Sequence, residues 1–356
     1  MIIASCIMPK SFSTKTTPLP LQTKIILVSL GTACALIISI GALQLFPASP
    51  RGTEFNSIGD LRRAMLEPGE ESMPSSGITE GPVSLRAIIQ SHPDDAIIYS
   101  LRPNLDLTFV RARVRTNSCG MRSPERPIKK PAGVFRIALL GDSFAFGWGV
   151  EQHETFAQRL EDNLNYISQG APRFEVLNFG VPGYSTFQEI ALFEERGLDF
   201  DPDAVLVYFV QNDFGMPFFI RDLSGSGGIL SSMKFVQLGR QFLSPDAVNE
   251  QIKRMGLDPN RAFQKLASLT ALHGLKTYVT INPRKSWKSD LQRLYALKNR
   301  SGIQFIPLRE GLLEHMKREN IPEADLTLSF DPHPSPIRHN ILGSLLTPYF
   351  IDAASS

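Results

Sequence analysis

The sequence predicts an α/β domain, with a parallel sheet covered by helices on both faces, in the C-terminal part of the chain. Three observations support this fold class. Short β-rich apolar runs alternate with longer helical patterns after Gly133, each run is apolar on both faces, and residues 133–356 have the length of one α/β domain. Alternation of strands and helices is typical of parallel strand connections.

The predicted strands and helices follow one another along the domain. The strands are residues 135–140, 174–179, 204–210, 276–281 and 303–308. The helical patterns are residues 154–166, 187–196, 261–275 and 287–300, and a final one covers 337–351. In such a sheet, reactive and binding residues are expected just past the carboxyl ends of the strands.

An uncharged apolar run, residues 25–46, precedes this domain. As a helix it would be about 33 Å long, enough for a hydrocarbon layer of about 30 Å, and it is longer than the apolar core of a cleaved signal peptide. Lys10, Lys15 and Lys24 precede it, whereas Arg51 alone follows within fifteen residues. The positive-inside rule then predicts a single-pass signal anchor, with residues 1–24 in the cytoplasm and the C-terminal domain on the extracytoplasmic side.

Residues 47–132 are predicted to be a linker and a membrane-proximal segment. Residues 67–82 are polar and rich in Pro, Gly and Ser, as flexible linkers are. The later run LDLTFVRARVRTN alternates like a strand and would project Arg111, Arg113 and Arg115 from one face. Seven basic residues and one acid lie between Arg111 and Lys130. An anionic partner would explain them, but we favour a solvated strand face.

Composition excludes several other classes of protein. The 37 basic and 35 acidic residues balance to a net charge of +2, which argues against a nucleic-acid partner. The three cysteines, Cys6, Cys34 and Cys119, supply neither a disulfide framework nor a four-ligand zinc site. The predicted anchor would separate them, so we expect no disulfide within the chain.

Four loops contain residues of the types that can catalyse a reaction or bind a substrate. Ser143 lies in GDSF after the first strand, the loop NFGVPGYS (178–185) follows the second, and Asn212 in QND follows the third. Asp331 and His333 lie in DPHP near the C-terminus. Each loop alone could be an ordinary turn, and Ser143 could be a helix N-cap. The sequence around Ser143 matches neither the G-x-S-x-G elbow nor a phosphate-binding loop.

Taken together and in this order, the four blocks resemble those of the SGNH (GDSL) hydrolase family. The resemblance implies a flavodoxin-like three-layer α/β/α sandwich that performs ester hydrolysis or acyl transfer. It implies that Ser143 is the nucleophile, His333 the base and Asp331 its carboxylate partner. Gly183, with Gly180 as the alternative, and Asn212 would be the oxyanion residues. The family's usual G-x-N-D has Val210 in place of its glycine, which puts the shape of the Asn212 loop in doubt.

The chemistry of these residue types is consistent with that implication. A serine hydroxyl needs an adjacent base, and a carboxylate would fix the imidazole tautomer. The oxyanion would be held by the backbone N–H groups of Ser143 and Gly183 and by the Asn212 amide. No cofactor or metal is required. The remaining histidines, His92, His153, His273, His315 and His339, are predicted to be structural, with His339 in a capping or surface contact.

We therefore expect a membrane-anchored serine esterase acting on small-molecule, lipid or carbohydrate esters of acyl or acetyl groups. Two alternatives stay open. The same serine relay could transfer an acyl group to an envelope or extracellular polysaccharide, or the fold could be a non-catalytic module that binds carbohydrate or lipid. Residues 214–260 interrupt the alternation and contain several aromatic residues. They could be a lid over the site or an additional buried helix.

Overall fold

The computed structural model describes residues 85–214, 258–283, 287–294 and 302–355. The chain divides into two units, 1–54 and 55–356, and all described residues belong to the second. The predicted tail, anchor and Pro/Gly/Ser-rich linker lie outside the described residues, as do positions 215–257 of the insertion. No helix in the described ranges is long and apolar enough to cross a bilayer.

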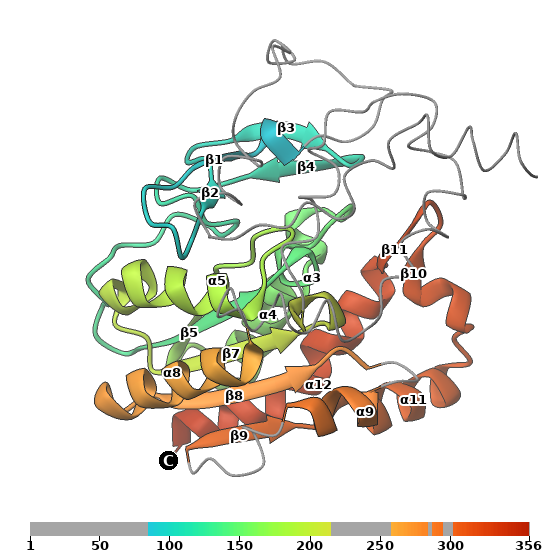
Figure 1. Cartoon of the computed structure of the whole chain (residues 1–356). Helices are drawn as coiled ribbons and strands as arrows, with labels where there is room; N and C mark the ends of the chain where they lie inside the picture. The colour runs from blue at the N-terminus through green and yellow to red at the C-terminus, as the bar shows by residue number, and fades with distance from the viewer. Residues whose placement is uncertain (1–84, 215–257, 284–286, 295–301, 356) are drawn as a thin grey trace, which may run out of the picture. The chain divides into compact units, whose positions relative to one another are not determined.

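A five-stranded parallel sheet forms the centre of the second unit (Figure 1). Its strands are β5 (Val134–Gly141), β6 (Arg173–Asn178), β7 (Ala204–Phe209), β8 (Lys276–Ile281) and β9 (Ile303–Ile306). They lie side by side in the order β6-β5-β7-β8-β9. This is the flavodoxin-like strand order, in which the first strand lies between the second and third. The five predicted strands and the parallel α/β fold are thus confirmed.

Helices bury both faces of this sheet. Along β5, Ile137 and Leu139 point into one core and Ala138 and Leu140 into the other, as the period of two requires. The first core is closed by α4 (Phe156–Ser168) and α12 (Pro336–Ser355), and the second by α5 (Thr186–Leu192) and α8 (Pro259–Leu272). Burial on both faces explains why each strand is an unbroken apolar run.

Further helical elements connect the strands and helices of these layers. They are α3 (Ser143–Phe146), η2 (Gln152–Glu154), the π-helix η3 (Phe193–Gly197), η4 (Leu198–Phe200), η5 (Gln211–Phe214), α9 (Trp287–Arg293), α11 (Leu308–Glu319) and η7 (Glu323–Leu326). The helix α11 packs on α12 and is not among the predicted helices. Its mainly charged sequence, LREGLLEHMKRE, buries only Leu308 and Leu312, so its apolar signal is weak.

The segment before β5 is folded onto the sheet domain. It contains η1 (Leu85–Ala87) and two antiparallel pairs, β1 (Ile89–Ser91) with β2 (Tyr99–Leu101), and β3 (Asp106–Phe109) with β4 (Ala112–Arg115). The Tyr99 hydroxyl donates to the Pro182 carbonyl at 3.0 Å, and the Gln188 amide donates to the Ile97 carbonyl at 2.9 Å. Residues 85–132, which we assigned to a linker and membrane-proximal segment, therefore pack against the sheet domain.

The run predicted as one strand is a hairpin. Phe109 pairs with Ala112, and the two turn residues, Val110 and Arg111, have φ values of 49° and 66°. Positive φ at both positions is the geometry of a type I′ turn, which normally uses Asn-Gly or Asp-Gly. Because the sequence has Val-Arg at these two positions, the residues themselves do not indicate a turn.

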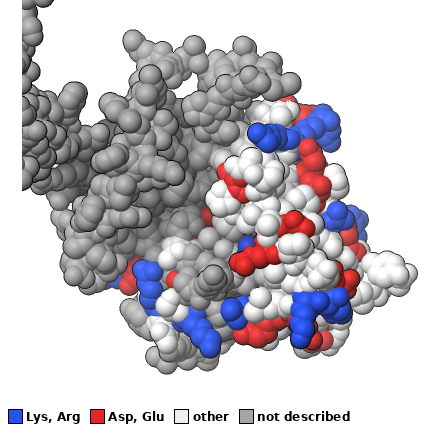
Figure 2. Space-filling model, turned by 90° about the vertical axis from the view of Figure 1, so that its right-hand side faces the viewer, with Lys and Arg blue, Asp and Glu red and all other residues white. Residues whose placement is uncertain are grey.

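The basic residues between Arg111 and Lys130 have separate environments. Arg113 and Arg115 are exposed and pair with Asp106, as expected for a solvated strand face. Arg126, in contrast, is buried against Glu161. Figure 2 shows Lys and Arg interspersed with Asp and Glu over the described part of one face. The seven positive charges do not act as one patch.

A buried ion pair fixes β5 to β6. The Arg136 guanidinium, with no exposed surface, lies 2.9 Å from the Glu175 carboxylate and donates to the carbonyls of Pro127, Ile128 and Phe200. A buried charge of this kind is tolerated because its donors are satisfied. The contacts to Pro127 and Ile128 hold the chain that leads from the hairpins into the sheet.

Candidate active site

Ser143 lies at the carboxyl end of β5, at the start of α3. Asp142 caps this short helix, because its carboxylate accepts the Phe144 N–H at 2.9 Å. The Ser143 side chain is nearly buried, with 8% of its surface exposed. The strand and the cap together fix the backbone of Ser143.

Gly180 and Asn178 hold α3 from the neighbouring loop. The Asn178 amide donates to the Ala145 carbonyl at 2.8 Å, and the Gly180 N–H donates to the Asn178 side chain at 2.9 Å. A Cβ on Gly180 would lie 2.4 Å from the Phe146 nitrogen, so only glycine fits. Gly180, the alternative oxyanion glycine, is thus a packing residue whose N–H is already used.

The loop near the C-terminus brings two of the predicted residues to Ser143. His333 and Asp331 lie on β11 (Asp331–Pro334), which pairs with β10 (Thr327–Leu328) just before α12. The Ser143 Oγ lies 2.8 Å from the His333 Nε2. The other ring nitrogen, Nδ1, is hydrogen-bonded to the Asp331 carboxylate, which also accepts the His333 backbone N–H at 3.0 Å. The structure therefore aligns a serine, an imidazole and a carboxylate from distant parts of the sequence.

Aromatic rings hold the His333 imidazole on two sides. Trp148 stacks on it with ring centroids 5.1 Å apart and an interplanar angle of 21°, and Phe144 lies at 5.1 Å and 45°. Trp148 in turn contacts Phe109 of β3 edge to face at 5.2 Å. Sequence reasoning did not assign these aromatics to the site, although Phe144 and Trp148 lie within five residues of Ser143.

A buried arginine fixes the turn that carries Trp148. The Arg122 guanidinium donates to the carbonyls of Phe146, Gly147 and Val150, at 3.0, 2.5 and 2.6 Å. Burial lowers the pKa of Arg122 to about 10, so it is still a cation at neutral pH. From the sequence it was only one member of the basic run.

The predicted oxyanion glycine lies in a turn beside the Ser143 loop. The Val181 N–H donates to the Gly141 carbonyl at 3.1 Å, and the Tyr184 N–H closes the turn onto the Val181 carbonyl at 3.2 Å. Gly183 has a φ of 79°, the conformation that glycine adopts after proline in a type II turn. Within the part of the chain that the structure describes, the N–H groups of Ser143 and Gly183 donate to no other residue.

The third predicted oxyanion residue is only partly described. Asn212 lies in η5, directly after β7, and its side chain is outside the described atoms. Val210, at the position of the usual family glycine, is buried in the core. Its N–H donates to the Asp213 carboxylate at 2.7 Å, which holds this loop in place.

Buried carboxyl groups lie beneath these loops. Glu189 on α5 is buried, and neither of its side-chain oxygens has a hydrogen-bond partner among the described residues. Burial, and then the nearby Asp142, raise the pKa of Glu189 well above its usual value. The pKa of Asp213 is raised by burial and then by Glu189 and Asp142. Asp142 and Asp213 hold loop geometry, because their carboxylates accept the Phe144 and Val210 N–H groups.

His339 has a structural role. Its Nδ1 accepts the Phe156 N–H, at the first residue of α4, at 3.1 Å. The side chain is fully buried, so the capping prediction agrees with the structure and the surface alternative was wrong. Burial, followed by the positive charges of Arg122 and Arg338, lowers the pKa of His339 to about 3. His92 is likewise buried, 3.1 Å from the Glu195 carboxylate.

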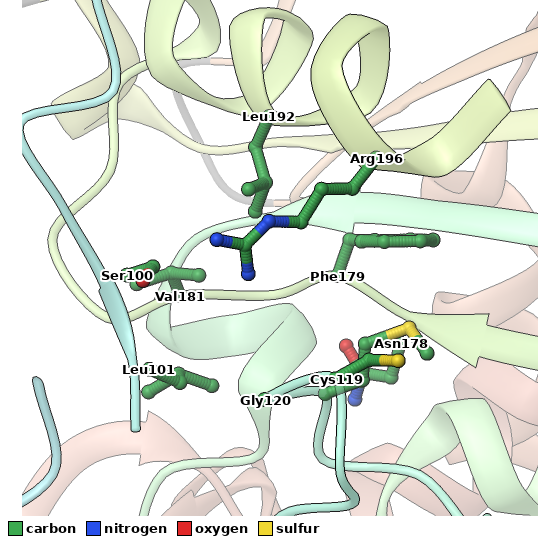
Figure 3. A pocket seen from close by; sticks show the side chains of 10 residues that line it. Ser100, Leu101, Cys119, Gly120, Asn178, Phe179, Val181, Leu192 and Arg196 are labelled. Atoms are coloured by element: carbon green, nitrogen blue, oxygen red, sulfur yellow. The ribbon is translucent and has the colours of Figure 1, made fainter. Parts of the chain in front are cut away.

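A small pocket lies behind the loop of Asn178 and Val181, and no triad residue lines it. Figure 3 shows the Arg196 side chain pointing into this pocket, between Phe179 and Val181. The Ser100 hydroxyl in its wall is buried and has no partner among the described residues.

Comparisons with known proteins gave structural matches only. No family model and no curated protein matches the chain. Among solved structures, a two-domain esterase active on acetylated mannans has 15% identity and a TM-score of 0.41, covering 63% of this chain and 50% of its own. An acetyl xylan esterase has 13% identity, a TM-score of 0.40 and coverages of 60% and 99%. A member of the lipolytic protein G-D-S-L family from Veillonella parvula has 12% identity, a TM-score of 0.36 and coverages of 61% and 98%. The chain thus spans half the length of the two-domain esterase.

Proposed function

We propose that the chain is a serine esterase that hydrolyses carboxylic esters through Ser143, His333 and Asp331. The observation that carries this proposal is the continuous hydrogen-bonded line from the Ser143 Oγ through both ring nitrogens of His333 to the Asp331 carboxylate. A serine hydroxyl becomes an effective nucleophile when a base lies within hydrogen-bond distance and is itself oriented by a third group.

The reaction would proceed through an acyl-enzyme. The Ser143 oxygen attacks the ester carbonyl while the His333 Nε2 takes its proton, and Asp331 stabilises the resulting imidazolium. The contact with Asp331 keeps the Nδ1 proton in place, so that Nε2 can accept. His333 then gives its proton to the leaving alcohol, and a water molecule attacks the acyl group on Ser143 to release the acid.

The negative charge on the tetrahedral intermediate would be held by the loops around Ser143. Its backbone N–H and that of Gly183 have no other acceptor among the described residues, which supports a role as oxyanion donors. The Asn212 amide is the proposed third donor. Loss of one donor of this kind typically lowers the rate by about 10²–10³.

The proposal is tested by replacing Ser143 with alanine. Hydrolysis of p-nitrophenyl esters of increasing acyl length should fall by about 10⁴-fold or more at every length, because the nucleophile is lost. Ser344→Ala, at an exposed serine on α12, is the matched control and should retain activity. Unchanged hydrolysis in Ser143→Ala would overturn the proposal, and an acylated-sugar product formed in the presence of an oligosaccharide would favour acyl transfer.

We also propose that this domain acts outside the cytoplasm on a single-pass anchor. The support is the uncharged run 25–46 and the excess of lysine before it. Protease added to intact spheroplasts should degrade the catalytic domain. Protection of the domain until the membrane is permeabilised would place it in the cytoplasm.

A further inference from the structure

The tip of the β3–β4 hairpin is held in an unfavourable conformation next to the triad. Val110 and Arg111 both have left-handed backbone angles. For a β-branched residue such as valine this conformation is uncommon and unfavourable, so the surroundings must hold the tip in place.

Contacts at Gly149 show what surrounds the tip. A Cβ at Gly149 would lie 2.6 Å from Leu328, 3.4 Å from Phe330 and 3.7 Å from Val110. Gly149 thus marks the place where the hairpin tip, the Trp148 turn and the strand pair of the triad loop meet. Since Trp148 stacks on His333, the hairpin forms one side of the candidate active site.

Arg111 presents a positive charge at this position. Its guanidinium lies over the Phe330 ring, 4.2 Å from the ring centroid, and Phe330 directly precedes Asp331. Phe330 is 40% exposed and the Arg111 side chain is exposed, so both can reach a ligand. The described acids close to this place already have partners, because Asp106 bonds to Arg113 and Asp331 bonds to His333. Within the described ranges, Arg111 forms no ion pair.

We propose that Arg111 determines substrate specificity by binding a carboxylate on the substrate of Ser143. The chemical class would be esters of carboxylate-bearing sugars. A guanidinium matches a carboxylate with two parallel hydrogen bonds, and stacking on Phe330 orients the fork while leaving its edge free. Phe330 would offer an apolar face to the rest of the substrate. The inference rests on the proposed esterase function.

Two substrates that differ only in charge test the proposal. Methyl mono-O-acetylglucuronoside carries a carboxylate at the position where methyl mono-O-acetylglucoside carries a hydroxymethyl group. For the full-length protein, we expect kcat/KM to favour the uronoside by about tenfold, mainly through KM, as one charge-assisted contact would give. Arg111→Gln should bring this ratio close to one. Arg113→Gln, two residues along the same hairpin but paired with Asp106, should keep it.

A binding measurement separates failure of this inference from failure of the esterase proposal. Saturation-transfer NMR with the Ser143→Ala protein should show methyl glucuronoside bound more tightly than methyl glucoside, and the preference should disappear when Arg111→Gln is added. Equal binding of the two sugars, or equal loss of kcat/KM on both esters in Arg111→Gln, would overturn the specificity role. If the p-nitrophenyl esters and both sugar esters are all left unhydrolysed but the binding preference is present, the esterase proposal fails and the carboxylate site stands.

Discussion

Replacing His339 with asparagine should remove a large part of the pH dependence of stability between pH 5 and 8. In the folded protein the imidazole is fully buried, accepts the Phe156 N–H through Nδ1, and has a pKa of about 3. In the unfolded chain the pKa of the imidazole is ~6.5. Below about pH 6.5 the unfolded chain therefore binds a proton on His339, whereas the folded protein does not. The stability that the neutral histidine contributes is complete above about pH 6.5 and is lost as the pH falls toward about 3.

The magnitude follows from the two pKa values. Relative to pH 8, protonation of the unfolded chain should lower the free energy of unfolding by about 0.8 kcal/mol at pH 6 and about 2 kcal/mol at pH 5. Asparagine places its Oδ1 near the position of Nδ1, so it can accept the same N–H without titrating. It loses the imidazole stacked on Phe156, so the variant should be less stable than the wild type at pH 8.

Urea unfolding, followed by tryptophan fluorescence at pH 5, 6, 7 and 8, measures this effect. The quantity of interest is the free energy of unfolding of the wild type minus that of His339→Asn, because other titrating groups cancel in the difference. It should shrink by about 2 kcal/mol from pH 8 to pH 5. His339→Gln should give the same trend with a different offset. A difference that stays constant with pH would refute the reasoning.

Three further predictions concern the site and its support. Asp331→Asn should lower kcat by about 10⁴-fold, because the imidazole would lose its orienting carboxylate, and steady-state kinetics would contradict this if kcat changed less than tenfold. Gly180→Ala should destabilise the fold by about 1–3 kcal/mol in thermal melts, because its Cβ would lie 2.4 Å from the Phe146 nitrogen, and an unchanged melting temperature would contradict this. Glu189→Gln should gain stability relative to the wild type as the pH rises above about 4.5. The reason is that the pKa of the buried Glu189 carboxyl is raised, so its ionisation in the folded wild type is unfavourable. Equal urea midpoints for both proteins at pH 5 and 8 would argue against this.

The sheet could be predicted because its strands are buried on both faces. Their apolar runs have clear ends, and each predicted strand agrees with the structure within two residues. The strand order was implied by the resemblance to a known family, since the runs themselves carry no information on which strands are neighbours. Three loops at the carboxyl ends of strands and a fourth near the C-terminus supplied the candidate site, and the structure brings Ser143, His333 and Asp331 together.

The parts that were missed depend on contacts between distant segments. The Val110-Arg111 turn lacks the residues that signal a hairpin, and its conformation is held by Gly149 and its neighbours. Arg122 is of a residue type that is usually exposed, so only the fold reveals that it is buried under the Trp148 turn. The stacking of Trp148 on His333 likewise joins residues far apart in sequence.

Covalent labelling of Ser143 tests the central claim most directly. The full-length protein is treated with a fluorophosphonate, digested, and mapped by mass spectrometry. We predict a single phosphonate adduct on Ser143 in the folded wild type, none in Ser143→Ala, and strongly slowed labelling in His333→Ala, because the base that activates the hydroxyl is gone. Absence of an adduct on the folded wild type, or an adduct on another residue with Ser143 unmodified, would contradict the proposed nucleophile.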